Sequence, residues 1–135
     1  MLKTKDIMRL SGARRPVFLN LFKIRFPIGA IASIGHRLAG VALAAALPFL
    51  VATFERSLSS EQAYRQALAA WRSPAGRVAA LLLCWALAHH LLAGVRHLLM
   101  DVDIGSSLPT ARKTAWIVVV GGVVAAAALL WVLRP

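Results

Sequence analysis

The sequence predicts an all-α membrane protein with three transmembrane helices that belong to a larger helix bundle. Of its 135 residues, 59% are hydrophobic, and the mean hydropathy of +0.70 is too high for a soluble domain of this length. Three apolar runs, residues 28–54, 78–100 and 114–133, are each long enough to cross the ~30 Å hydrocarbon core of a bilayer. Three helices leave no room for a second core, so we expect residues 1–135 to form a single membrane-anchor domain.

The net charge of +11 fits a membrane topology better than a nucleic-acid surface. Seven lysines and arginines precede the first span, in a basic arm at residues 1–26, and the loop at residues 101–113 adds two more. The basic residues of the longer loop at residues 55–77 are partly offset by two glutamates. By the positive-inside rule, the N-terminus and the second loop are expected in the cytoplasm, and the first loop and the C-terminus outside.

Local signals predict the connections and irregularities of the three helices. Pro48 lies inside the first span and should kink it. In the external loop, Ser59-Ser60-Glu61 is typical of a helix start, so we expect a short amphipathic helix through Ala70 on the outer surface. Residues 101–105 should end the second long helix, and residues 106–109 should form the turn. The third span contains only apolar side chains between its two tryptophans and is expected to serve packing.

The end of the second span carries a histidine-rich face. His90, Gly94 and His97 share one helical face with small residues, whereas His89 points about 100° away and is expected to have a structural or interfacial role. Ionisable residues are costly inside a membrane, so they indicate a functional site by default. This face predicts a shallow groove in which His90 could bind a flat ligand such as haem through its iron. Arg96, on the neighbouring face, is expected to be a snorkelling anchor.

The first span repeats this pattern. His36 shares a face with small residues, and Ser33 and Arg37, one turn apart on the adjacent face, can bind one ligand together. At about 1.5 Å of rise per residue, His36, Arg37 and His97 are expected at the cytoplasmic edge and His90 roughly 10 Å deeper. Cationic groups at that edge could pair with the two propionates of a haem, because carboxylates in a low dielectric require partners.

Several motifs recur in the order and at the separations of a known family: Arg15-Pro16-Val17, Ile24-Arg25-Phe26-Pro27-Ile28, Ser33-Ile34-Gly35-His36-Arg37-Leu38-Ala39-Gly40, and His90 followed by Gly94-Val95-Arg96-His97 and Asp101. Over residues 15–103 they resemble the cytochrome b (b556-type) membrane-anchor subunit of bacterial succinate dehydrogenase, the succinate:quinone oxidoreductase or complex II of the tricarboxylic acid cycle. The resemblance implies a multi-pass subunit of the bacterial inner membrane without flavin or iron–sulfur chemistry of its own. With a second small anchor, it would hold haem b and a ubiquinone site beneath the iron–sulfur and flavoprotein subunits.

Carried over by position, the resemblance implies that His90 is the axial ligand of the haem iron, and that a partner anchor supplies the second axial histidine. It implies that Ser33 and Arg37 bind the quinone. The residues at the haem propionates and pocket would be His36, Arg37, Gly94 and His97. The sequence departs from the family pattern at Gly35, where a larger aliphatic residue is usual, and at His89, an adjacent second imidazole; the role of Asp101 is left open.

Three alternatives stay open at this point. A haem-free structural anchor would only dock soluble subunits and would show no visible absorption. A self-sufficient cytochrome would use two histidines of this chain, for example His90 with His36, but the expected difference in depth disfavours that pair. The anchor of a fumarate reductase would run the same chemistry in the opposite direction, and these residues do not separate the two directions.

Overall fold

The computed structural model describes residues 23–132, which form four helices and, within that range, no strand. The long helices α2 (Ile28–Leu58), α4 (Pro74–Asp101) and α5 (Leu108–Val132) are each long and apolar enough to cross a membrane. A shorter helix, α3 (Glu61–Arg72), joins α2 to α4. The predicted all-α membrane fold is confirmed, while most of the basic arm, including Arg15-Pro16-Val17, lies outside the described residues.

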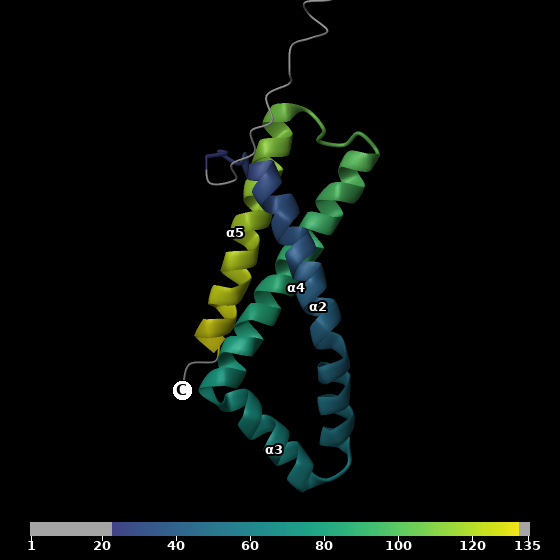
Figure 1. Ribbon diagram of the computed structural model, residues 1–135, viewed down its shortest axis with the longest axis vertical. Coiled ribbons are helices and arrows are strands. Elements are labelled where there is room, and N and C mark those ends of the chain that lie inside the picture. The colour runs from purple at the N-terminus through teal and green to yellow at the C-terminus, as the bar shows by residue number, and fades with distance from the viewer. Residues whose placement is uncertain (1–22, 133–135) are drawn as a thin grey trace, which may run out of the picture.

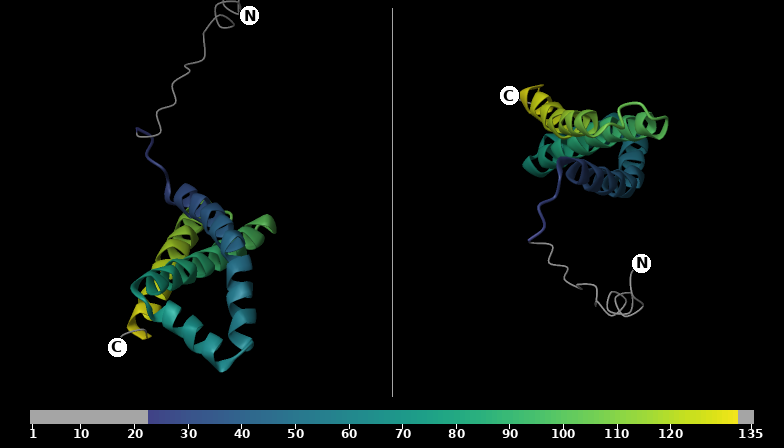
Figure 2. Two further views of the ribbon diagram at one scale, coloured as in Figure 1. Left: turned by 60° about the horizontal axis from the view of Figure 1, so that its bottom comes forward. Right: turned by 90° about the horizontal axis from the view of Figure 1, so that it is seen from above.

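The three long helices pack side by side, and each contacts the other two. Figure 1 shows α2 crossing α4 near the middle of the bundle. The start of α2 and the α4–α5 turn lie at one end of the molecule, and α3 and the end of α5 lie at the other, as three successive crossings require. Figures 1 and 2 also show that α2 changes direction along its length, and this helix contains Pro48. The predicted kink is therefore present, as expected where a proline removes a helical hydrogen bond.

The corner helix α3 begins and ends at side-chain caps. The Ser60 hydroxyl accepts a hydrogen bond from the backbone N–H of Ala63 at 3.1 Å, which satisfies one free donor of the first turn. At the other end, Ser73 caps the start of α4 by accepting from the N–H of Gly76 at 3.1 Å. The amphipathic helix that we expected through residue 70 is confirmed and ends at Arg72.

The α4–α5 turn is tighter than predicted. Helix α4 ends at Asp101, and Asp103 adopts a left-handed backbone conformation with φ of 61°, which Asp tolerates better than most residues. The N–H of Ile104 donates back to a carbonyl of the last turn of α4 at 2.9 Å. Pro109, expected in the turn, lies instead in the first turn of α5, where a missing N–H costs no helical hydrogen bond.

Small side chains form the interior where the helices meet. Among residues 23–132, the buried hydrophobic residues are Ala32, Ala39, Ala86, Ala93, Ala115 and Val118. None of the described residues buries a large side chain completely. Small residues let membrane helices approach closely, so the bundle is held by close backbone packing. The large apolar side chains point outward, towards lipid or a neighbouring chain.

Candidate functional site

Three of the four histidines meet where α2 crosses α4. The imidazole of His36 on α2 stacks on that of His90 on α4, with ring centroids 4.2 Å apart and an interplanar angle of 21°. His97 lies further along α4, and its ring centroid is 5.3 Å from that of His36. Gly94 lies between the two α4 histidines in sequence, and a Cβ added to it would lie 3.7 Å from Nε2 of His36. The structure thus brings His36, His90, Gly94 and His97 together. The helical faces predicted that His90, Gly94 and His97 lie on one side of the second span, but they did not predict that His36 contacts His90.

The hydrogen bond made by His90 determines which of its ring nitrogens is free. Nδ1 of His90 lies 3.1 Å from the backbone carbonyl oxygen of His36. A carbonyl only accepts, so this contact assigns the proton to Nδ1 and leaves a lone pair on Nε2. Within the described chain, Nε2 has no hydrogen-bond partner and is not fully enclosed. Metal-bound histidines commonly donate their other ring N–H to a backbone carbonyl in this way.

Gly40 on α2 provides the space for the His90 ring. A Cβ at this position would lie 2.9 Å from Cε1 of His90, which is closer than real contacts allow. The small-residue face of α2 is therefore a surface onto which an imidazole fits. The sequence indicated small residues on both helices, and the structure shows that this glycine contacts the predicted ligand directly.

The expectation that His90 lies roughly 10 Å deeper than His36 is wrong. The two rings are in van der Waals contact, with centroids 4.2 Å apart. Residue counts along two helices give their relative depths only when the helix axes are parallel. Because α2 crosses α4 at an angle (Figure 1), residues near the crossing meet even when their distances from the helix ends differ.

The stacked geometry also disfavours the alternative in which His36 and His90 both bind one haem iron. Two imidazoles that bind one iron from opposite sides point ring nitrogens at each other. His36 and His90 instead present their flat faces to each other, 21° from parallel. A bis-histidine site on this pair would require both side chains to turn.

Ser33 and Arg37 lie one turn apart on α2, outside the histidine cluster. Both belong to the continuous helix, so their side chains share a face. Ser33 is half-buried and Arg37 is exposed, and neither forms a hydrogen bond or ion pair within residues 23–132. Within the described chain, no hydrogen bond or ring contact joins Arg37 to a histidine, although Arg37 follows His36 directly in sequence.

His89 occupies a different environment from its neighbour. It is 2% exposed, and its ring stacks on Trp85 of the same helix with centroids 5.2 Å apart. Its Nε2 lies 3.2 Å from the carbonyl oxygen of Ala32 on α2. Enclosure of this kind agrees with the expected structural role.

Comparison with known proteins identifies the family. Residues 11–129 match the family described as Succinate dehydrogenase/Fumarate reductase transmembrane subunit. This chain belongs to that family. It is 36% identical over 110 residues to the Succinate dehydrogenase cytochrome b556 subunit of Coxiella burnetii (strain RSA 493 / Nine Mile phase I), covering 81% of this chain and 88% of the relative.

Two further relatives carry the same name. The Paracoccus denitrificans protein is 36% identical over 119 residues, or 87% of this chain and 90% of the relative. The Rickettsia bellii (strain RML369-C) protein is 31% identical over 119 residues, or 88% of this chain and 92% of the relative. The resemblance seen in the motifs is confirmed over nearly the whole chain, and these relatives are subunits of an oxidoreductase complex. Together with three apolar helices, this makes the chain a multi-pass membrane subunit.

Arg96 of this transmembrane subunit has a role that the sequence did not reveal. Its Nε donates to the hydroxyl of Thr114 at 3.1 Å and its Nη2 donates to the carbonyl of Ala111 at 3.2 Å. Arg96 therefore ties α4 to the start of α5, in addition to any snorkelling towards the membrane edge. The partners are 15 and 18 residues away across a turn, so no helical spacing could have indicated them.

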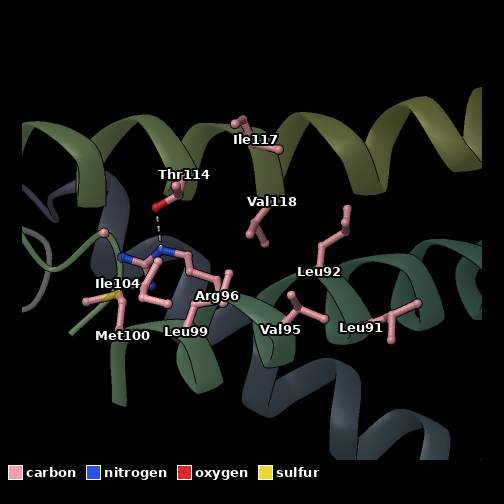
Figure 3. Close-up of a pocket in the computed structure, with 11 residues that line it drawn as sticks. Leu91, Leu92, Val95, Arg96, Leu99, Met100, Ile104, Thr114, Ile117 and Val118 are labelled. Carbon is pink, nitrogen blue, oxygen red and sulfur yellow. Dashed lines mark hydrogen bonds between the residues drawn. The ribbon is translucent and has the colours of Figure 1, made fainter. Parts of the chain in front are cut away.

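The same arginine lines a groove of about 350 Å³ between α4 and α5. Figure 3 shows Arg96 reaching Thr114 at one end, while leucine, isoleucine, valine and methionine side chains line most of the remainder. No histidine lines this groove. It is therefore separate from the histidine cluster, and its walls offer no imidazole to a metal.

Proposed function

We propose that this chain is the haem b-containing anchor subunit of a succinate dehydrogenase complex and forms part of its ubiquinone-reduction site. One observation carries the proposal: the Nδ1 hydrogen bond of His90 to the His36 carbonyl leaves Nε2 free beside two further imidazoles. The relatives' name, cytochrome b556, supports a haem b in this chain as well. Their designation as succinate dehydrogenase subunits favours succinate oxidation over fumarate reduction.

The residues at the helix crossing fit haem b. Glycines at positions 40 and 94 remove side chains beside the rings of His90 and His36. In our assignment His90 holds the iron, and the propionates and pocket are formed by His36, Arg37, Gly94 and His97. Imidazole and guanidinium N–H groups are the donors that carboxylates require in a low dielectric. When bound, haem b supplies a one-electron redox centre.

Ser33 and Arg37 are the proposed quinone-binding pair. They offer a hydroxyl and a guanidinium from one face of α2, and neither is engaged within the described chain. The guanidinium of Arg37 stabilises the negative charge that develops on a quinone oxygen during reduction, and Ser33 supplies a second donor. The site lies near the start of α2, on the side that the positive-inside rule assigns to the cytoplasm, where protons are available.

The proposed partners follow from what this chain lacks. Because His36 and His90 present their ring faces to each other, we assign the other ligand that the haem iron would need to a second small anchor subunit. The outward-facing apolar residues suit contact with that anchor and with lipid. The iron–sulfur and flavoprotein subunits would dock at the cytoplasmic end, with the N-terminus cytoplasmic and the C-terminus external in a bacterial inner membrane.

A visible difference spectrum tests the haem assignment. The complex is purified through this chain as wild type and as His90→Ala, and the dithionite-reduced minus oxidised spectra are compared. We expect a b-type α-band in the wild type that is lost or shifted in His90→Ala, because the variant removes the Nε2 ligand. Leu91→Ala is the matched control, since Leu91 is 63% exposed and lines the groove between α4 and α5, which contains no histidine. A band unchanged in His90→Ala would contradict the assignment, and no band in the wild type would favour the haem-free anchor.

The quinone assignment is tested by separating two activities. Arg37→Leu should lower the rate of quinone reduction on the order of 10²-fold, which is the usual effect of removing one donor to a developing charge. Succinate oxidation by an artificial soluble acceptor should be unchanged, because that acceptor bypasses the membrane site. Arg56→Leu, an arginine in the last turn of the same helix, is the control. Equal loss of both activities in Arg37→Leu would contradict a quinone role.

A further inference from the structure

His89 occupies a closed slot between all three long helices. A Cβ added to Gly35 on α2 would lie 2.6 Å from Nε2 of His89, and one added to Gly122 on α5 would lie 3.2 Å from the His89 Cβ. The ring of Trp85 covers a face of the imidazole, 30° from parallel. The slot therefore depends on two glycines, one on each neighbouring helix. It admits this imidazole and leaves no room for a larger group.

The hydrogen bonding within the slot commits His89 to the backbone of α2. Its Nε2 contacts the carbonyl oxygen of Ala32 at 3.2 Å, which assigns the ring proton to Nε2. Nδ1 then carries the lone pair, but this atom is buried and has no hydrogen-bond partner in the described part of the chain. A ligand would have to displace the packed helices to reach it. His89 is therefore closed to a metal, although its chemistry matches that of His90.

The two adjacent histidines bind successive turns of α2. His89 donates to the carbonyl of Ala32, and His90 donates to that of His36, four residues further along. Consecutive helical residues point about 100° apart, so the two rings contact α2 on different sides. Rotation of α4 that exposed the His89 ring would also withdraw His90 from Gly40. The orientation of one ring thus fixes that of the other.

We propose that His89 is a positioning residue: its hydrogen bond to Ala32, inside the slot formed by Gly35 and Gly122, fixes the rotation of α4 and thereby makes His90 the imidazole that is presented to the haem iron. This inference rests on the proposed haem-binding function and deepens it, since it states how one of two neighbouring histidines is selected.

The first test compares His89→Leu with His89→Gln in the purified complex. The amide Nε2 of Gln can donate to the Ala32 carbonyl, whereas Leu fills a similar volume without a donor. We expect haem occupancy to fall about tenfold in His89→Leu, the change in an equilibrium constant that corresponds to loss of one buried hydrogen bond. The remaining haem should show a shifted low-spin EPR signal and midpoint potential, and His89→Gln should restore all three readouts.

Two outcomes would overturn the inference. Wild-type occupancy, EPR signal and potential in His89→Leu would show that the slot does not orient His90. Loss of haem in both His89 variants, with the α-band retained in His90→Ala, would make His89 the ligand. Absence of a haem band from the wild type would instead overturn the proposed function itself, so the two failures are distinguishable.

A double-mutant cycle tests the slot without using haem. Gly35→Ala should lower the thermal midpoint of the complex in the wild-type background, because its Cβ displaces the His89 ring. The same substitution should have much less effect in a His89→Ala background, where the space is empty. Gly29→Ala is the control, since a Cβ there meets nothing within 4 Å. Additive effects of Gly35→Ala and His89→Ala would overturn the proposed slot.

Discussion

His89 and His90 are neighbours of the same residue type, and both donate a hydrogen bond to α2, but they lie in different surroundings. His89 lies in the closed slot, and His90 lies in the cluster that it forms with His36 and His97. The slot is enclosed by α2, α4 and α5, whereas the ring contacts of the cluster come from α2 and α4. Both imidazoles donate to a carbonyl of α2. The difference lies in the remaining nitrogen, which is enclosed in His89 and accessible in His90. Access to a lone pair, rather than residue type, therefore separates a structural histidine from a candidate ligand.

The largest effect is expected from filling the closed slot from the α5 side. Gly122→Leu places bulk where even a Cβ would lie 3.2 Å from Trp85 Nε1 and from the His89 Cβ. Overpacking of this kind should destabilise the subunit by about 3 kcal/mol, measured as the thermal unfolding midpoint of the detergent-solubilised complex. Val123→Leu is the neighbouring control, because Val123 is 57% exposed. An unchanged midpoint in Gly122→Leu would contradict three-helix enclosure.

A smaller effect is expected in the cluster of His36, His90 and His97. It should change the midpoint potential of the haem and leave the stability of the subunit unchanged. His97→Leu removes a proposed N–H donor to a haem propionate, which leaves more negative charge beside the iron. The midpoint potential should fall by about 60 mV, the equivalent of a tenfold change for one electron. Potentiometric titration of the α-band measures this shift, and the unfolding midpoint should be unchanged because His97 lies outside the slot. A fall in thermal stability with no change in potential would place His97 with the structural residues.

The smallest effect on stability is expected at Gly94, where the histidine cluster has room for an added methyl group. Gly94→Ala introduces a Cβ at an ordinary contact distance of 3.7 Å from Nε2 of His36, so stability should change by less than about 0.5 kcal/mol. Gly40→Ala is the matched comparison, since its Cβ would lie 2.9 Å from the His90 ring and should displace it. Visible spectra report the haem site of both variants, and melting curves report their stability. Equal losses in the two variants would show that the cluster is as closed as the slot.

Much of this architecture could be predicted from the sequence because the relevant signals are local. Apolar run length identified the three spanning helices, and a serine cap with an acidic neighbour identified α3. Helical periodicity alone grouped His90 with His97 and separated both from His89. These features depend on residues within a few turns of one another, and the structure confirms the helices and the grouping of the rings.

Contacts between helices could not be predicted in the same way, because periodicity within a helix does not set its crossing angle. The estimate of depth failed for His36 and His90 for this reason. Gly35 and His89 depart from the family pattern at two separate places in the sequence, and the structure shows that they meet each other. The link from Arg96 to Thr114 likewise depends on how α4 and α5 pair across a turn.

The small-residue interior implies an unusual map of mutational tolerance for this subunit. In a soluble domain, the positions most sensitive to substitution are those whose large side chains fill the core. Here large apolar residues lie on the outside, where one can replace another with little change in packing. The restrictive positions are those at which a side chain is small or missing, such as Ala93 and Gly122. Sequence drift in this subunit should therefore consist mainly of exchanges between bulky residues, with enlargements at the helix contacts removed by selection.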